Sequence, residues 1–430
     1  MGAESARDPA AVFAAAMESA GPFERDPELA VALSGGPDST CLLRLADVWA
    51  RARGGRVVAV TVDHGLRVGS DAEAARVGRD CAALGIRHVV LAWTGAKPAR
   101  AVQERARAAR HALLEDWCRE AGILHLLMGH HADDQDETIA MRAVRRSGSL
   151  GLAGMAAISE RRHVRLLRPL LSVRADRLKT WLTERGIAWI DDPSNRDPRF
   201  LRARMRAAPE PPTRLPRWPD RAALERSLSS WLGVHAAVHP EGWISLAATE
   251  FLRLPHDVAT LALRAAVMAV GGAVHPPRQE GLGSAVTWVA AAPAGTRDVA
   301  GCRLCRRDDE LIVLRAPPRR SVIGAKANRG ETIWDGRFLV RLASADVAPL
   351  EVLPAGIASP SAGRMVEVGT LRRVAAALPV TRGLDGEARL SHVLCGRRSV
   401  ALVSVAELSV IFRPPRPFAG AAFAGSPAQV

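Results

Sequence analysis

The sequence predicts an α/β protein: a Rossmann-like parallel sheet at the amino terminus, then a helical domain and a small α+β domain. Three observations lead to this prediction. Short apolar runs alternate with amphipathic segments over the first 140 residues, a proline-rich stretch follows residue 207, and the last third contains hairpin patterns. Uninterrupted apolar runs indicate strands that helices cover on both faces.

Four apolar runs predict the strands of the first sheet. They are Leu29–Leu33, Arg56–Val62, His88–Ala92 and Ile123–Met128. The segments between and after them have helical spacing: Asp38–Ala52, Ser70–Leu84, Ala101–Ala121 and the residues after His131. Polar clusters follow three of the strands, beginning at Ser34, Asp63 and His130, and ligands of such sheets bind at the carboxyl ends of the strands.

The remaining chain predicts two further domains. Helices are expected at Ala222–Leu232, Val258–Val270 and Gln279–Ala291, and hairpins at Arg303–Arg315 and around Asp335-Gly336. The expected boundaries are 1–208, 209–296 and 297–430.

Composition narrows the class of protein. In 430 residues no apolar run reaches the roughly 18 residues of a membrane span, and the first residues show no export signal, so we expect a cytoplasmic protein. Six scattered cysteines do not form a disulfide framework, and we interpret Cys302 and Cys305 as two strand cysteines that face the same way.

Positive charge indicates an acidic partner. The net charge is +14, and residues 142–206 carry 16 basic but only 6 acidic side chains. Such a block is typical of nucleic-acid binding, although a solvated arginine-rich face would give the same pattern.

A glycine loop between the first strand and helix carries the strongest signal of chemistry. It is Ser34, Gly35, Gly36, Pro37, Asp38 and Ser39. Glycines let backbone amides approach an anion, and the following helix dipole attracts it. Asp38 is suited to hold Mg²⁺ against phosphate oxygens, although it could simply cap the helix. The absence of a lysine excludes a Walker loop.

This loop resembles that of the PP-loop ATP pyrophosphatases, which have an adenine nucleotide alpha hydrolase-like fold and activate substrates by adenylation. Further motifs resemble the bacterial tRNA(Ile)-lysidine synthases over about residues 27–208. The motifs are Asp63-His64-Gly65, the run from Gln103 to His111, Gly129-His130-His131 to Thr138, Arg168-Pro169-Leu170, and Asp191 to Asn195. His111 stands where the family usually has Tyr, and Ala203 where it usually has Asn.

The resemblance implies a ligase that uses ATP and Mg²⁺ to join free L-lysine to carbon 2 of the wobble cytidine of tRNA(Ile) with anticodon CAU. The product, lysidine, forms through an adenylated cytidine and changes decoding from AUG to AUA. Whether the protein forms a homodimer stays open.

The resemblance and the spacing together give the candidate site. The catalytic candidates are Asp38, His130, Asp134, Glu137 and Arg107. The ATP-binding candidates are Ser34 to Ser39 with Val62, Asp63 and His64. The tRNA-binding candidates are Arg142, Arg145, Arg146, Arg202, Arg204 and Arg206. The metal candidates are Asp38 and Asp133.

Spacing supports the acidic cluster, because His130, Asp133, Asp134 and Glu137 would share one face of a helix. A solvated acidic helix start is the alternative, and His64 and His131 could be packed histidines.

Two other functions compete with this interpretation. A PP-loop tRNA thiolation enzyme would need a reactive cysteine near the loop, but Cys41 and Cys118 lie inside predicted helices. An inactive RNA-binding homologue would keep the fold without the chemistry.

Overall fold

The computed structural model describes most of the chain. The described residues are 8–65, 70–94, 102–144, 152–161, 163–190, 221–239, 241–273, 275–316, 325–327, 330–342, 350–354, 379–382, 388–390, 408–414 and 418. They divide into two compact units, one up to Arg226 and one from Ser227, and each is described by itself. Within these ranges no helix has the length and apolar character to cross a bilayer.

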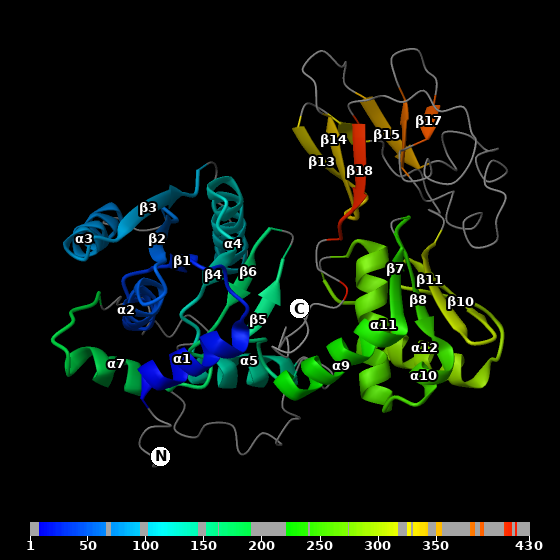
Figure 1. Cartoon of the computed structure of the whole chain (residues 1–430), viewed down its shortest axis with the longest axis horizontal. Coiled ribbons are helices and arrows are strands. Elements are labelled where there is room, and N and C mark those ends of the chain that lie inside the picture. Colours follow the sequence, from blue (N-terminus) through cyan, green and yellow to red (C-terminus); the bar gives the residue numbers. More distant parts are fainter. Residues whose placement is uncertain are drawn as a thin grey trace. The chain divides into compact units, whose positions relative to one another are not determined.

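A six-stranded sheet forms the centre of the first unit (Figure 1). Its strands are β1 (Glu28–Ala32), β2 (Arg56–Asp63), β3 (Arg87–Ala92), β4 (His125–Leu127), β5 (Ile158–Glu160) and β6 (Arg165–Leu167). The strand order is β3-β2-β1-β4-β6-β5, and all neighbours are parallel except β5 and β6. The α/β prediction is therefore confirmed.

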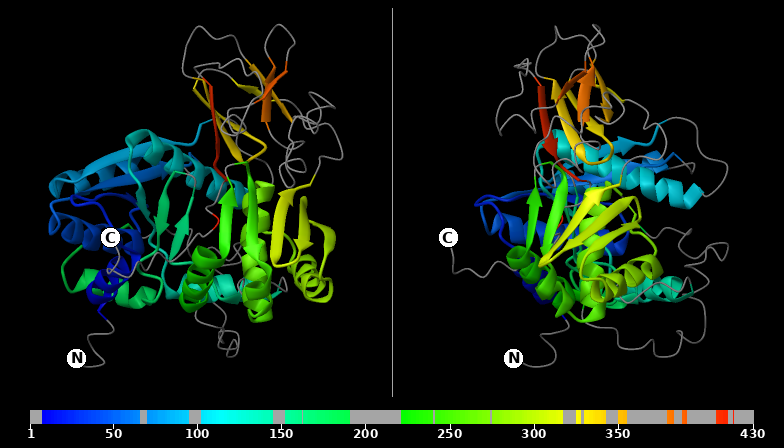
Figure 2. Two further views of the ribbon diagram at one scale, coloured as in Figure 1. Left: turned by 45° about the vertical axis from the view of Figure 1, so that its right-hand side comes forward. Right: turned by 90° about the vertical axis from the view of Figure 1, so that its right-hand side faces the viewer.

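Helices cover both faces of this sheet, as two further views show (Figure 2). They are α1 (Pro9–Ala20), α2 (Pro37–Arg51), α3 (Ser70–Ala83), α4 (Val102–Ala121), α5 (Ala132–Val144) and α7 (Ala175–Thr183). Leu29 and Val31 of β1 pack in one core with α1, α2, α3 and α7. Ala30, which points to the other face, packs in a second core with α4.

Helix α1 is an element that the sequence analysis did not predict. Asp8 caps it by accepting a hydrogen bond from the Ala10 amide (3.3 Å), and Pro9 occupies its first turn. Phe13 and Met17, one turn apart, are buried against the sheet core. The apolar pattern of α1 is weak in the sequence, because half of its residues are alanines.

The second unit contains an antiparallel sheet of order β7-β8-β11-β10-β9. Its strands are β7 (Ala236–His239), β8 (Trp243–Ala247), β9 (Gly295–Val299), β10 (Cys302–Arg307) and β11 (Glu310–Arg315). The helices of this part of the chain are α9 (Arg221–His235), α10 (Ala248–Leu252), α11 (His256–Gly271) and α12 (Gln279–Ala291). The segment expected to be helical thus also contains β7 and β8. Strand β7 pairs with β8, and β8 pairs with β11, so the sheet continues across residue 296.

Two smaller sheets complete the second unit. One has the order β12-β15-β16-β17 and the other β13-β14-β18. Their strands are β12 (Ala325–Ala327), β13 (Gly330–Trp334), β14 (Phe338–Leu342), β15 (Leu350–Pro354), β16 (Pro379–Arg382), β17 (Ala388–Leu390) and β18 (Leu408–Phe412). The predicted turn at Asp335-Gly336 joins β13 to β14, with positive φ at both residues (50° and 65°).

The interpretation of Cys302 and Cys305 needs a correction. Both lie on β10 and are buried, but side chains three residues apart on a strand point to opposite faces. Cys302 faces α11, where its Sγ lies 3.4 Å from the Val267 carbonyl oxygen, and Cys305 is outside that core. Both are free thiols, and the described residues contain no cluster of three side chains able to hold a metal.

Candidate active site

The candidate site lies where two loops meet at the carboxyl edge of the first sheet. Strand β1 lies between β2 and β4, so the loops after β1 and β4 leave the sheet side by side. Gly129, after β4, packs against the start of α2: a Cβ there would lie 3.2 Å from backbone atoms of Asp38 and Ser39. Only a residue without a side chain allows the loops to approach this closely.

The glycine loop after β1 is held in an open turn. Gly35 has a φ of +80°, and a Cβ there would lie 2.8 Å from Ile190 and 2.9 Å from Val77. The Ser39 hydroxyl lies 3.1 Å from the Ser34 hydroxyl and donates to the Gly36 carbonyl. No side chain of the described residues caps α2, so its first-turn amides are available to an anion.

Three carboxylates surround His131, which lies two residues after Gly129 in the loop that follows β4. Its Nε2 lies 3.5 Å from Oδ2 of Asp38 and 3.5 Å from Oδ2 of Asp134, and its Nδ1 lies 3.3 Å from Oδ2 of Asp133. Burial alone would lower the pKa of His131, but contact with Asp38 and the neighbouring negative charges outweigh burial and raise it. We call Asp38, His131 and Asp134 the acidic centre.

The two neighbouring aspartates of α5 have different surroundings. Asp133 accepts hydrogen bonds from the Ala175 amide (2.8 Å) at the start of α7 and from Arg174 (3.1 Å). Asp134 contacts the same ring nitrogen of His131, Nε2, as Asp38 does, and it is buried, as is Glu137 one turn further. The predicted single face is therefore split, because α5 begins only at Ala132 and leaves His130 in the loop.

Two carboxylates of the acidic centre, Asp38 and Asp134, suit a divalent cation whose other ligands come from the substrate, since the described residues hold no group of three protein ligands. Oδ1 of Asp38 is buried and accepts no hydrogen bond in the described part of the chain. One or two carboxylates together with substrate phosphates are the usual ligands of Mg²⁺. Asp134 shares the Nε2 atom of His131 with Asp38, whereas Asp133 contacts Nδ1, and the expected metal role of Asp133 stays a prediction.

His130 lies in the opposite electrostatic environment. It is 8% exposed, and burial together with the charges of Arg168, Arg107 and Arg110 lowers its pKa to about 2. Its neighbour His111 has a pKa of about 3, first because of burial and then because of Arg110 and Arg107. Both rings are therefore neutral at pH 7, and Arg107 belongs to this basic side of the site.

The end of β2 adjoins the glycine loop. Val62, Asp63 and His64 are half-buried, and Asp63 accepts a hydrogen bond from the Gly65 amide (2.8 Å) that turns the chain. Beneath them, the Thr61 hydroxyl donates to the Leu33 carbonyl (2.8 Å), so a side chain continues the sheet pairing up to the loop.

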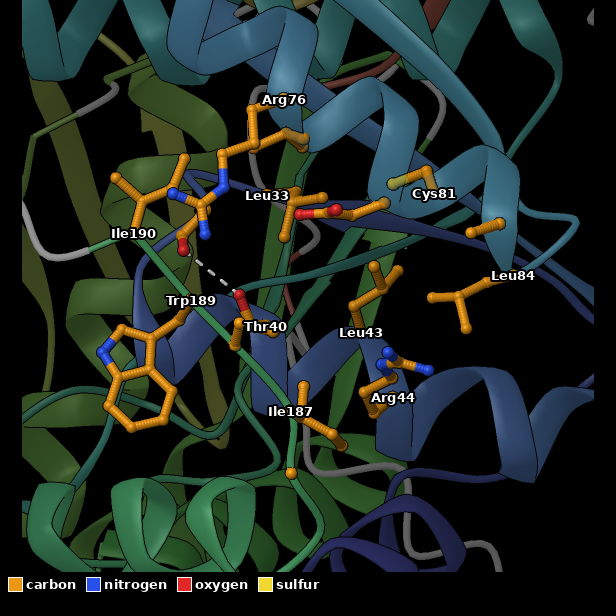
Figure 3. Close-up of a pocket in the computed structure, with 16 residues that line it drawn as sticks. Leu33, Thr40, Leu43, Arg44, Arg76, Cys81, Leu84, Ile187, Trp189 and Ile190 are labelled. Atoms are coloured by element: carbon orange, nitrogen blue, oxygen red, sulfur yellow. Dashed lines mark hydrogen bonds between the residues drawn. The ribbon is translucent and has the colours of Figure 1, made fainter.

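A separate cavity of about 200 Å³ lies against Gly35 between α2, α3 and residues 186–190 (Figure 3). Its walls are largely apolar, with Arg44 and Arg76 among its polar residues, and the Thr40 hydroxyl donates to the Gly35 carbonyl (3.3 Å) at its edge. Of the predicted site residues only Gly35 lines it, so this cavity is not the place where the predicted chemistry converges.

The predicted tRNA-binding arginines are mostly outside the described residues. Arg142 is described, and its Nη1 donates to the Gly154 carbonyl at 2.7 Å. Arg145, Arg146, Arg202, Arg204 and Arg206 are not described.

The sequence analysis assigned no role to two residues that the structure places at the site. His131 is central to the acidic side, and Arg168 lies on the basic side. The sequence could have indicated a site role for Arg168, because this residue directly follows the apolar end of β6 and so lies at the carboxyl edge of the sheet.

Comparisons with known proteins show the family of the chain. The PP-loop domain family matches residues 10–211. A tRNA(Ile)-lysidine synthase of Hyphomonas neptunium is 39% identical over 317 residues, which cover 70% of this chain and 85% of that protein. One of Caulobacter vibrioides is 33% identical over 374 residues, covering 85% and 86%. One of Bradyrhizobium sp. is 49% identical over 188 residues, 43% of this chain, so the match spans about half of that relative's length (52%).

Proposed function

Since the chain belongs to the tRNA(Ile)-lysidine synthase family, we propose that it joins free L-lysine to carbon 2 of the wobble cytidine of tRNA(Ile) with anticodon CAU. The reaction uses ATP and passes through an adenylated cytidine. The observation that carries the proposal is the convergence of Asp38 after β1 with His131 and Asp134 after β4, beside an uncapped helix start.

The glycine loop binds the phosphates of ATP in this proposal. The free first-turn amides of α2 and the hydroxyls of Ser34 and Ser39 face the anion, and they stabilise the negative charge that develops as pyrophosphate leaves. The adenosine lies near Val62, Asp63 and His64, because β2 adjoins β1 at this edge. The cytidine carbonyl oxygen at position 2 attacks the α-phosphate, which gives the adenylated base.

Two carboxylates of α5 orient the second nucleophile. Asp134 and Glu137 are buried carboxylates on one side of α5, and they suit the ammonium of lysine. A carboxylate oxygen of Glu137, which is not one of the residues that would hold Mg²⁺, takes a proton from this ammonium, since the amine is unreactive while charged, and the free amine then displaces AMP at carbon 2. Asp38 and Asp134 would hold Mg²⁺, which would supply positive charge to the phosphates.

The basic side receives the nucleotide to be modified. Arg107 neutralises negative charge on the activated base or the α-phosphate. A base in the single-stranded anticodon loop can be drawn out of its stack without breaking a base pair. The described arginine Arg142 and the five arginines outside the described residues remain proposed contacts to the tRNA.

One experiment tests the activity and the loop assignment together. The purified chain is incubated with ATP, Mg²⁺, labelled lysine and a tRNA(Ile) transcript with anticodon CAU, and acid-stable label on the RNA is measured. The matched RNA control replaces the wobble cytidine with uridine. We expect label only on the cytidine transcript.

Two variants refine the test. Asp38→Asn should lose at least a hundredfold in rate, since a charge beside the phosphates is removed. Asp136→Asn is the matched control, because Asp136 is exposed and pairs with Arg174. Full activity of Asp38→Asn, or label on the uridine transcript, contradicts the proposal.

The cysteines do not favour sulfur transfer, the competing function. Burial raises the pKa of Cys41 and Cys118 to about 12 and that of Cys81 to about 11, so these thiols stay protonated. Cys395 is outside the described residues. An inactive homologue would release no pyrophosphate when all three substrates are present, and that measurement separates it from the proposed ligase.

A further inference from the structure

Three guanidinium groups of the first unit converge on one short segment, residues 154–156. Nη1 of Arg142 and Nη1 of Arg221 both donate to the Gly154 carbonyl, at 2.7 and 2.6 Å. Nη1 of Arg168 donates to the Ala156 carbonyl at 2.8 Å. We call Arg142, Arg168 and Arg221 the arginine cluster.

The segment that holds the arginine cluster is itself fixed. The Gln135 side chain donates to the Met155 carbonyl (3.0 Å) and accepts from the Met155 amide (2.6 Å). Gly154 has a φ of +76°, and a Cβ there would lie 2.7 Å from the Gln135 side chain. The carbonyls are thus held in place by α5, which also carries Asp134, so the cluster has a defined position relative to the acidic centre.

The cluster has more positive than negative charge. Arg168 is 8% exposed, and no carboxylate in the described part of the chain forms an ion pair with it. Burial and the charges of Arg161, Arg107, Arg221 and Arg142 lower its pKa to about 9. Glu225 pairs with Arg221 at 2.7 Å. Several guanidinium groups that close together are unfavourable unless an anion joins them.

A cavity gives an anion access to the cluster. It has a volume of about 410 Å³ and is lined by two members of the cluster, Arg168 and Arg221, and also by Glu225, whereas Arg142 is not among its lining residues. Strand β6 pairs with β4, so Arg168 leaves the sheet at the same edge as His130, whose pKa it lowers. Arg168 therefore belongs both to the lining of the cavity and to the basic side of the candidate site.

We propose that the arginine cluster binds a phosphate group, and specifically a backbone phosphate of the tRNA near the nucleotide that is modified. A guanidinium fork matches phosphate geometry, and the three groups are already held in place by carbonyl oxygens. The triphosphate of ATP is the other source of phosphate, but the start of α2 already offers it a site. This inference rests on the proposed function for the identity of the RNA.

The test measures binding of the full-length protein to the tRNA(Ile) transcript at several salt concentrations, and the KM for ATP. Arg221→Gln is the first variant, since Arg221 is only half-buried and its loss does not open the core. We expect roughly tenfold weaker RNA binding and an unchanged KM for ATP. The slope of the logarithm of the binding constant against the logarithm of the salt concentration should be smaller by about one, as for the loss of one phosphate contact. Arg168→Gln should have a larger effect of the same kind.

The matched control is Arg177→Gln, which removes one positive charge from the exposed side of α7. Its salt dependence should equal that of the unaltered protein. An equal loss in this control would show that only net charge matters and would overturn the inference. Thermal unfolding checks that Arg168→Gln folds; if it does not, Arg221→Gln decides.

Two other outcomes also contradict the inference. A higher KM for ATP with unchanged RNA binding would assign the phosphate to the nucleotide, and no change in either would remove the site. If the unaltered protein transfers no lysine but Arg221→Gln still weakens RNA binding as expected, the proposed function fails and the phosphate site stands.

Discussion

Replacing Gly129 with alanine tests whether the two loops of the site must touch. A Cβ at this position would lie 3.2 Å from three backbone atoms, the carbonyl carbon of Asp38 and the Cα and nitrogen of Ser39. Ordinary contacts begin at 3.4 Å, and backbone atoms cannot rotate away as a flexible side chain can. The loop after β4 must therefore move away from α2 by a few tenths of an ångström.

The expected cost has two parts. Overpacking of this kind destabilises a protein by about 1–3 kcal/mol. The same movement separates His131 and Asp134 from Asp38, which His131 contacts at 3.5 Å, and small misplacements of reacting groups lower rates strongly. We expect kcat/KM for lysine transfer to fall roughly tenfold or more.

The assay combines urea unfolding with lysine transfer to the tRNA. Gly281→Ala in α12 is the control, because a Cβ there meets nothing within 4 Å and alanine favours a helix. That variant should keep its activity and gain up to about 1 kcal/mol of stability. Unaltered stability and activity of Gly129→Ala would refute the reasoning that this glycine sets the distance between the loops.

Three further predictions follow from the described contacts. Asp133→Ala should destabilise the protein by about 1 kcal/mol in urea unfolding, since it removes the cap of α7, and should change activity only a few-fold; a hundredfold loss would support Asp133 as a metal ligand. Thr61→Val leaves the Leu33 carbonyl without its donor and should cost about 1–3 kcal/mol in the same measurement, whereas an unchanged midpoint would mean that water replaces the hydroxyl. Cys41 and Cys118, whose pKa values are raised to about 12, should react with iodoacetamide at pH 8 at least about a hundredfold slower in the folded than in the unfolded protein; rapid labelling, measured by mass spectrometry, would reopen the sulfur-transfer hypothesis.

The first sheet could be predicted because its strands are buried on both faces and read as apolar runs. Each observed strand from β1 to β4 lies within a few residues of its predicted range. Strands β7 and β8 were missed because they are short and lie between longer helical patterns. Their place in the sheet depends on pairing with β11, more than 60 residues away, which a local pattern does not contain.

The candidate site was predictable in its residue types but less so in its pairings. Periodicity placed His130 on a helix, whereas the helix begins at Ala132, so the orientation of both histidines depends on the loop. Asp133 and Asp134 are adjacent in sequence but have different partners. Asp133 caps α7, whereas Asp134 lies with Asp38 at His131, and this difference depends on the position of α7 in the fold. Whether a charged residue pairs with its neighbours or a ligand is decided by tertiary contacts.

The position of β1 between β2 and β4 has a consequence for biosynthesis. Leu29 pairs with His125, a partner made on the order of a hundred residues later, and closing so long a loop slows folding. A nascent chain that has emerged only as far as α4 has the glycine loop but not Asp134. The complete nucleotide site, with both Asp38 and Asp134, should therefore form only after β4 and α5 have left the ribosome.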